Sequence, residues 1–248
     1  MATVSYSVDG AVGRLTISRP ERRNALNHAA LDELQDGIRR AVRDEVRSLV
    51  LVGDEGQFCS GADLKELEDL EFTRALRVVL DDLAGLPIST IAAISGACMG
   101  LGMQLALSCD LRLATEDARF AVPVAKLGLM VDHWTVQRLA LGVGHSTARW
   151  MLLTAEPVTA QRAHEVGLVH ELVDSLDRAD ELAEQVTTLA PLALAGSKLG
   201  LDLLERSSQE ADPDGRYRAA FEAAWASEDL VEGRRAFGER RRPDFKGV

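Results

Sequence analysis

The 248-residue sequence predicts an α/β protein, and three observations lead to that prediction. Short apolar runs alternate with stretches of helical periodicity in the first part of the chain, a pattern typical of parallel strands joined by helices. A glycine-rich turn, residues 96–102, leads from an expected strand into an expected helix. From about Thr135 onward the sequence is mostly helical. We therefore expect a core over residues 1–190 and a helical region over residues 191–248.

The individual elements follow from local patterns. Asp9-Gly10 is a strong hairpin signal, so we expect two strands at 4–8 and 12–18. The apolar run at 49–52 fits a strand that is buried on both faces. Apolar residues at helical spacing predict a helix over 28–43. We also expect a helix opened by a cap at Asp63, a helix at 72–83, strands at 88–94, 111–114 and 118–120, a helix from the glycine-rich turn to Leu107, and breaks at 142–144, Pro157, Gly167 and Pro191.

Composition excludes several classes of function. The formal net charge of −11 argues against nucleic-acid binding, which needs a basic surface. No apolar run reaches the roughly 18 residues of a membrane span, and the first residues do not resemble a signal peptide, so we expect a cytoplasmic protein. We expect no metal site, since no cluster of ligands at suitable spacing occurs. The three cysteines, Cys59, Cys98 and Cys109, are expected to be buried and reduced.

Basic residues gather at two places in this acidic chain. One cluster is Arg19, Arg22 and Arg23, and the other lies between Arg234 and the C-terminus. Such clusters are usually solvated faces or helix ends. On an acidic protein they are also the places where a phosphorylated ligand would bind.

Two segments carry the candidate chemistry. Residues 56–64 are expected to form a buried strand and a turn that leaves the Ala62 amide free. The Leu101 amide opens the helix after the glycine-rich turn, where it has no partner within the helix and lies at the positive end of the helix dipole. Two such amides converging on one point would form an oxyanion hole. The turn could equally serve packing or bind a phosphate.

Several motifs, taken together, resemble those of the crotonase (enoyl-CoA hydratase/isomerase) superfamily. They are Arg19-Pro20 with Asn24-Ala25-Leu26, residues 58–64, residues 91–96 with 100–110, Phe120 with Pro123 and Gly128, Gln137-Arg138-Leu139, Ala160 with Ala163 and Gly167-Leu168-Val169, and Arg242-Pro243 with Phe245. The resemblance covers nearly the whole chain and depends on motif order and spacing, so it is more specific than any single motif.

The resemblance implies a crotonase-like spiral of ββα units with a C-terminal helical trimerisation region, in a homotrimer or a hexamer made of two trimers. It implies an acyl-CoA ligand or substrate, no other cofactor, and a thioester oxygen held by the amides of Ala62 and Leu101. The basic C-terminal tail would reach the CoA phosphates. The CoA-binding residues implied by the resemblance are Arg22, Arg23, Ala25, Leu26, Ser60, Gly61, Asp63, Leu64, Gly100 and Gly102.

The chain departs from the family pattern at two positions. Hydratases of the family carry glutamates where Gln104 and Val124 stand here. A glutamate of suitable pKa can transfer the protons that hydration requires, and each general acid or base contributes about 10²–10⁴ in rate. Gln104 can only hydrogen-bond a water, and Val124 cannot do even that. We expect little hydratase activity, whereas the oxyanion hole would remain.

Asp132, eight residues beyond Val124, is the remaining carboxylate in this region. Related dienoyl-CoA isomerases and aroyl-CoA dehalogenases resemble this chain in carrying an active-site aspartate there. Asp132 fits the N-cap of a helix better than it fits a base or a nucleophile. His133 is expected in the wall of the acyl pocket, and Trp134 in the pocket or the core.

Two functions fit the sequence. The first is an acyl-CoA-binding protein of fatty-acid metabolism, similar to an actinobacterial paralogue that lacks both glutamates and presents acyl-CoA to fatty-acid synthesis enzymes. The second is an enzyme, either an isomerase or hydrolase that uses Asp132, or a weak hydratase that uses a water held by Gln104. We favour the first, because hydration most needs the two groups that are missing. Fold kinship alone does not decide between them.

Overall fold

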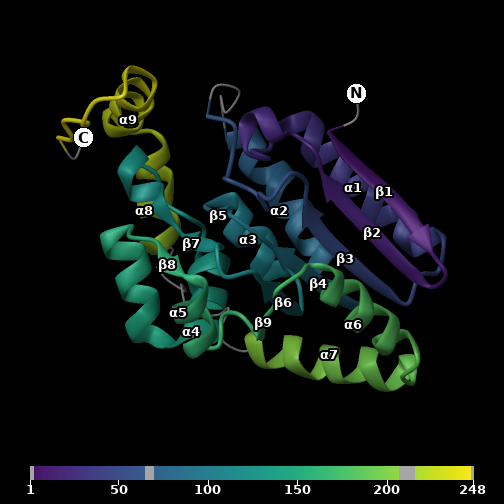
Figure 1. Ribbon diagram of the computed structural model, residues 1–248. Coiled ribbons are helices and arrows are strands. Elements are labelled where there is room, and N and C mark those ends of the chain that lie inside the picture. The colour runs from purple at the N-terminus through teal and green to yellow at the C-terminus, as the bar shows by residue number, and fades with distance from the viewer. Residues whose placement is uncertain (1–2, 65–69, 207–215, 247–248) are drawn as a thin grey trace.

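The computed structural model describes residues 3–64, 70–206 and 216–246. The helix expected to open at Asp63 would continue into 65–69, which lie outside the described residues. The structure is a mixed α/β fold, as the sequence predicted, with two sheets and a helical C-terminal part (Figure 1).

The larger sheet has six strands in the order β1-β2-β3-β4-β6-β9. The Asp9-Gly10 turn joins β1 and β2 as an antiparallel hairpin, and every later pair in this sheet is parallel. All six residues of β3 are buried, which confirms the prediction of a strand covered on both faces. The strands are β1 (Val4–Asp9), β2 (Val12–Ile17), β3 (Ser48–Gly53), β4 (Ser89–Ile94), β6 (Leu111–Ala114) and β9 (Glu171–Leu172).

The smaller sheet has three strands, β5 (Ala97–Met99), β7 (Arg119–Ala121) and β8 (Val158–Thr159), with β5 and β7 parallel. β5 lies within the segment 96–102, which was predicted as a plain turn. The prediction of a continuous strand within 56–64 is wrong. The structure has two isolated β-bridges there, Cys59 with Cys98 and Leu26 with Ala62. Pairing across the chain therefore replaces a continuous strand at this point. The sequence alone could not show this, because the partners are distant in the chain.

Helices cover both faces of the larger sheet (Figure 1). α1 (His28–Arg43), α2 (Leu70–Ala84) and α3 (Leu101–Ser108) belong to the main hydrophobic core on one face. α6 (Asp177–Thr187) packs on the other face, where Ala179 and Ala183 contact a second apolar cluster. The wholly buried α3 lies between the sheets and carries residues of the candidate site.

The rest of the described chain is helical apart from β8 and β9. Gly144 has non-helical backbone angles, so α4 is kinked where a break was predicted. Pro191 opens α7, as expected of a proline in a first helical turn. Figure 1 shows α8 and α9 as a lobe beside the small sheet. The helices are α4 (His133–Thr154), α5 (Ala160–Glu165), α7 (Pro191–Arg206), α8 (Arg216–Trp225) and α9 (Glu228–Glu239); short 3₁₀ helices are η1 (Pro20–Arg22) and η2 (Pro123–Leu127).

The three cysteines are buried and unpaired, as predicted. Burial raises the pKa of the Cys59 and Cys109 thiols to about 12 and that of Cys98 well above its usual value. Such thiols are inert as nucleophiles. Within the described residues no helix has the length and apolar character needed to cross a bilayer, and no group of His, Cys, Asp and Glu is arranged to hold a metal.

Candidate functional site

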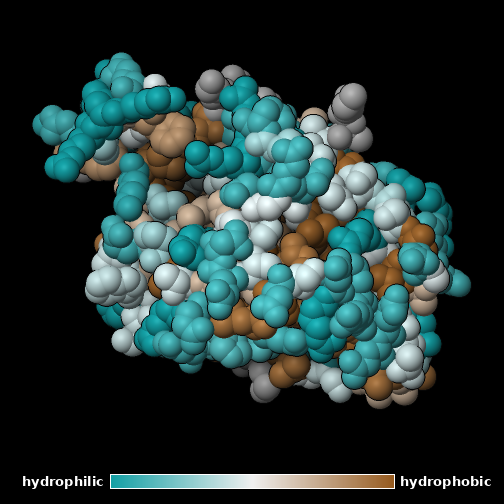
Figure 2. All heavy atoms as spheres, viewed as in Figure 1, coloured by the Kyte–Doolittle hydropathy of each residue, from teal (hydrophilic) through white to brown (hydrophobic). Residues whose placement is uncertain are grey.

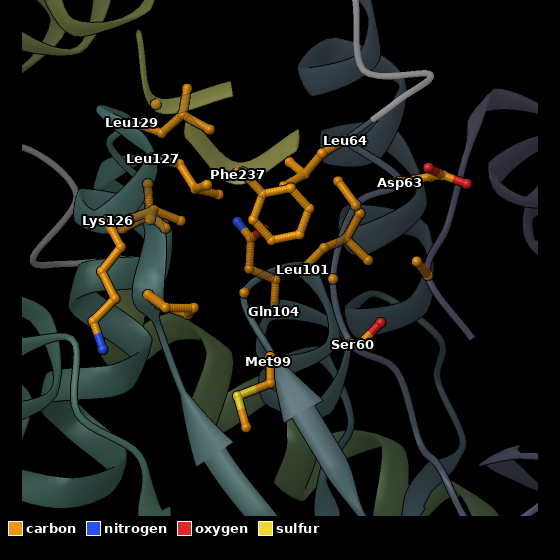
Figure 3. Close-up of a pocket in the computed structure, with 18 of the residues that line it drawn as sticks. Ser60, Asp63, Leu64, Met99, Leu101, Gln104, Lys126, Leu127, Leu129 and Phe237 are labelled. Atoms are coloured by element: carbon orange, nitrogen blue, oxygen red, sulfur yellow. The ribbon is translucent and has the colours of Figure 1, made fainter. Parts of the chain in front are cut away.

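A cavity of about 800 Å³ lies between α2, α3 and η2 and is partly covered by α8 and α9. Figure 2 shows apolar atoms in a hollow between the lobe formed by α8 and α9 and the rest of the molecule. Figure 3 shows side chains from several elements, including Leu101, Leu127 and Phe237, around this space. Its volume lies within the range of small-molecule binding pockets.

The Ala62 amide lies on the cavity side of its segment. Ala62 bridges Leu26 in the parallel sense: Leu26 N donates to Gly61 O, and Asp63 N donates to Leu26 O, at 2.9 and 2.8 Å. In such a bridge the amide of the middle residue points away from the partner strand. No acceptor for the Ala62 amide occurs among the described residues, and Ala62 lines the cavity.

The Leu101 amide lies at the start of α3. It follows Gly100, which has a φ of 52° and a ψ of −111° and gives no side-chain cap. No acceptor for this amide occurs in the described part of the chain either. A Cβ built on Gly61 would lie 4.0 Å from Leu101 N, so the two segments that carry the amides are neighbours. Two donors without an acceptor among the described residues thus lie on neighbouring segments of one cavity wall.

Gln104 and Asp132 also line the cavity, and Thr135 connects them from behind. Gln104 Nε2 donates to Thr135 Oγ1 at 2.7 Å, and that hydroxyl donates to Asp132 Oδ1. The same Oδ1 accepts from Thr135 N at 2.9 Å, so Asp132 is the N-cap of α4. Arg77 Nη1 lies 3.3 Å from Asp132 Oδ2. Asp132 therefore has donors on both oxygens, and the capping role preferred from the sequence is present.

Val124 also lines the cavity, together with other apolar residues of η2 and the segment that follows it. Sequence reasoning missed most of this apolar wall, because its members are ordinary core-type residues drawn from distant elements. Apolar residues that it did not identify as lining the cavity include Phe72, Leu76, Met99, Leu127, Leu129, Met130, Phe221, Trp225 and Phe237.

Arg22 and Arg23 are exposed and line the cavity, so they mark its mouth. Arg19, grouped with them from sequence, is only 6% exposed. Its guanidinium donates to Ala25 O at 2.5 Å and pairs with Asp63 at 3.2 Å. Arg19 is therefore not part of a surface cluster but fixes the loop that carries Arg22 and Arg23.

Two residues predicted to contact CoA do not line the cavity. Leu26 is fully buried and pairs with Ala62. A Cβ at Gly102 would lie 2.2 Å from Cys59 O, so that glycine allows α3 to pack closely on the Cys59 segment and does not admit a ligand. The other predicted CoA contacts, Arg22, Arg23, Ala25, Ser60, Gly61, Asp63, Leu64 and Gly100, all line the cavity.

His133, predicted in the pocket wall, is absent from the lining, and so is Trp134, for which the core was the alternative to the pocket. Trp134 packs against the core between two guanidinium groups, with Arg77 3.9 Å and Arg138 4.7 Å from the centre of its ring. The first turn of α4 turns these side chains away from the cavity, while its cap, Asp132, faces it. Adjacent positions on a helix point in different directions.

The C-terminal helices contribute to the site through close backbone contact with η2. A Cβ at Gly233 would lie 2.4 Å from Leu127 O, and the Trp225 indole donates to Met130 O at 3.3 Å. Phe237 and Arg241 then reach the cavity (Figure 3 shows Phe237). Arg241, from the basic tail, is held by two carboxylates, Glu232 and Glu239. These hydrogen bonds raise the pKa of Arg241 and lower the pKa of Glu232 to about 2.

The cavity wall offers few groups that could transfer a proton. The acidic residues in the described wall are Glu21 at the mouth, the ion-paired Asp63 and the capping Asp132, and no histidine or cysteine lines it. The wall thus combines two main-chain donors with mostly apolar side chains.

Comparison with known proteins gives the family. The family model described as enoyl-CoA hydratase/isomerase matches residues 7–248, and this chain belongs to that family, within the crotonase superfamily. The chain is 38% identical over 239 residues to the "Probable enoyl-CoA hydratase echA6" of Mycobacterium tuberculosis, covering 96% of this chain and 97% of that protein. It is 38% identical over 244 residues to the 2,3-dehydroadipyl-CoA hydratase of Escherichia coli, with 94% of each chain covered.

Solved structures agree with this assignment and with the predicted fold. An enoyl-CoA hydratase from Mycobacterium avium subsp. paratuberculosis superposes with a TM-score of 0.88 at 29% identity, over 99% of both chains. A methylmalonyl-CoA decarboxylase in complex with 2S-carboxypropyl-CoA superposes with a TM-score of 0.91 at 27% identity, over 99% of this chain and 98% of that one. Proteins with this fold therefore include enzymes of different reactions.

Proposed function

We propose that this protein binds acyl-CoA and hydrates enoyl-CoA poorly or not at all. The observation that carries the proposal is the pair of unpaired main-chain donors, the amides of Ala62 and Leu101, at the wall of one cavity. They would hold the thioester oxygen, the apolar wall would receive the acyl chain, and the mouth near Arg22 and Arg23 would receive the CoA phosphates. Binding of this kind needs no metal or redox cofactor.

Poor hydration follows from the side chains that face the amide pair. Hydration needs a base for water and an acid for the α-carbon, and each contributes about 10²–10⁴ in rate. Gln104 and Val124 stand in the wall, and neither transfers protons. Asp132 is already engaged by the helix cap, by Thr135 and by Arg77. The site thus supports binding of a thioester better than addition of water to it.

The test is a calorimetric titration with acyl-CoAs of increasing length, with product analysis on the same samples. We expect saturable binding, and turnover of crotonyl-CoA and of a longer enoyl-CoA near background. Turnover within about tenfold of an active family member would refute the binding role. In a companion variant, Gln104→Glu with Val124→Glu, partial recovery of hydration would show that the amide pair functions.

A second function, an isomerase or hydrolase, is favoured by one observation. The Asp132 carboxylate lies in the cavity wall and its side chain is 32% exposed, so a substrate could reach it. Screening dienoyl-CoA and acyl-CoA substrates would detect such an activity. If Asp132→Asn abolishes it while acyl-CoA still binds, Asp132 acts in catalysis as well as in capping; if no activity is found, the binding role stands alone.

The assembly, location and partners complete the proposal. Large exposed apolar side chains on α4 and α7 fit contacts with further copies of the chain in a homotrimer or a dimer of trimers; examples are Leu141, Trp150, Leu153, Leu192 and Leu201. An acyl-CoA ligand fits a cytoplasmic role in fatty-acid metabolism, with fatty-acid synthesis enzymes as partners. Light scattering coupled to size exclusion measures the assembly, and a monomer at micromolar concentration would contradict it.

A further inference from the structure

The Gln104 amide is fixed in one orientation by residues behind the cavity wall. Its Nε2 donates to Thr135 Oγ1 at 2.7 Å, and the Thr135 hydroxyl donates onward to Asp132 Oδ1. Arg77 holds the other oxygen of that carboxylate. Thr135 is fully buried and does not line the cavity.

The direction of this chain of hydrogen bonds follows from the groups that form it. A carboxylate offers no proton, so the hydrogen bond to Asp132 must use the Thr135 hydroxyl proton. The threonine oxygen then has only lone pairs left for Gln104 and can only accept from it. An amide turned by 180° would place two acceptors against each other. Nε2 must therefore face Thr135, and Oε1 must face away from it.

Gln104 Oε1 is consequently turned away from Thr135, where it can accept a hydrogen bond from a ligand. Among the described residues it has no donor, and the side chain is part of the cavity wall. Gln104 lies three residues after Leu101 on α3, so both are on the same face of the helix. A hydrogen-bond acceptor thus stands about one helical turn from the amide pair that would hold the thioester oxygen.

We infer that Thr135 is a positioning residue that sets the acyl specificity of the site through Gln104. This inference rests on the proposed thioester site. With Oε1 held toward the ligand, the site favours acyl groups with a hydrogen-bond donor near the thioester, such as a hydroxyl. It disfavours acyl groups that have only an acceptor there, such as an oxo group, because two acceptors would meet and Oε1 would lose access to water.

The experiment compares three ligands that differ at one carbon: butyryl-CoA, 3-hydroxybutyryl-CoA (each enantiomer) and 3-oxobutyryl-CoA. Calorimetry on the wild-type protein gives the ratio of dissociation constants. We expect the better hydroxy enantiomer to bind about tenfold more tightly than the oxo compound, the effect of one satisfied and one opposed hydrogen bond. Equal affinity for the two in the wild type would overturn the inference.

Two variants assign this ratio to Thr135. Thr135→Val keeps the shape but removes the hydroxyl, so the amide is free to turn and the ratio should fall to within about twofold of one. Thr135→Ser keeps the hydroxyl and should keep the ratio. If Thr135→Val fails to fold, Gln104→Met, which removes both amide groups, should abolish the ratio instead. A ratio that is unchanged in Thr135→Val, or in Gln104→Met, would overturn the role of the network.

The same titration separates this inference from the proposed function. If butyryl-CoA binds and the hydroxy and oxo compounds do not differ, only the positioning role of Thr135 fails. If none of the three ligands binds, the thioester site itself is refuted, and the role of Thr135 falls with it.

Discussion

The contact between α9 and η2 provides a test of how the C-terminal helices shape the cavity. Gly233 lies where α9 meets η2, and a Cβ at this position would lie 2.4 Å from Leu127 O and 2.6 Å from Leu127 C. Ordinary contacts begin at about 3.4 Å, so in Gly233→Ala the helix must move by about 1 Å. Both atoms belong to the backbone, which a side-chain rotation cannot relieve.

The expected cost can be set against a matched glycine in the same helix. Overpacking of this kind costs about 1–3 kcal/mol, partly offset by the ~1 kcal/mol that alanine gains over glycine in a helix. At Gly238, also in α9, a Cβ would meet nothing within 4 Å, so Gly238→Ala should show only the gain. Displacement of α9 also draws Phe237 from the cavity. We expect about 1 kcal/mol weaker acyl-CoA binding, about fivefold in Kd.

Thermal unfolding and calorimetric titration measure both effects. For a chain of this size each kcal/mol shifts Tm by about 2–4 °C, so Gly233→Ala should lower Tm or leave it unchanged while Gly238→Ala raises it. Affinity for a long-chain acyl-CoA should fall in the first variant and stay constant in the second. If Gly233→Ala raises Tm as much as Gly238→Ala does, and binds with wild-type affinity, then α9 does not pack on η2 as described.

Four further predictions concern the buried residues. The buried thiols should react with a disulfide reagent at pH 8 only after unfolding, and one fast thiol in the native protein would contradict their burial. Burial raises the pKa of the Cys109 thiol in the folded protein from 9.0 to about 12, so its contribution to stability is present below pH 9 and is lost as pH rises toward 12. Between pH 9 and 10 the free energy of unfolding in urea should therefore fall more steeply in the wild type than in Cys109→Ala, by up to ~1.4 kcal/mol. Gly102→Ala should lower Tm by several degrees, because the new Cβ would meet Cys59 O. Gly142→Ala, which has open space around it, should not lower Tm. Equal Tm values for the two variants would count against the close packing of α3. Asp63→Asn breaks the buried ion pair with Arg19 and should lower the free energy of unfolding by about 3–5 kcal/mol. Arg22→Gln removes an exposed partner of the same carboxylate and should lower it by less than ~1 kcal/mol. Equal losses of stability in urea unfolding would show that the Arg19 pair contributes no more than the exposed one.

Much of the fold could be predicted because local sequence patterns indicate it. The hairpin at Asp9-Gly10, the helix His28–Arg43 and the doubly buried strand β3 have the signals that turns, amphipathic helices and central strands require. The short strands β6 and β7 were predicted, but three others were missed. β5, β8 and β9 have two or three residues each, too few to show a period, and they exist only because a partner from elsewhere in the chain lies beside them.

For the candidate site, the sequence determined which residue types are available. They are glycines around the start of a helix, an amide side chain in place of a carboxylic acid at Gln104, and an aspartate that can cap α4. Tertiary structure decided which of them face the ligand. Leu26 and Trp134 pack against the core, and Arg19 is buried in an ion pair with Asp63. The orientation of the Gln104 amide depends on Thr135, 31 residues away. Local sequence fixes backbone preferences over a few residues, whereas the direction of a side chain and the partner of a polar atom depend on contacts between segments that only the folded chain brings together.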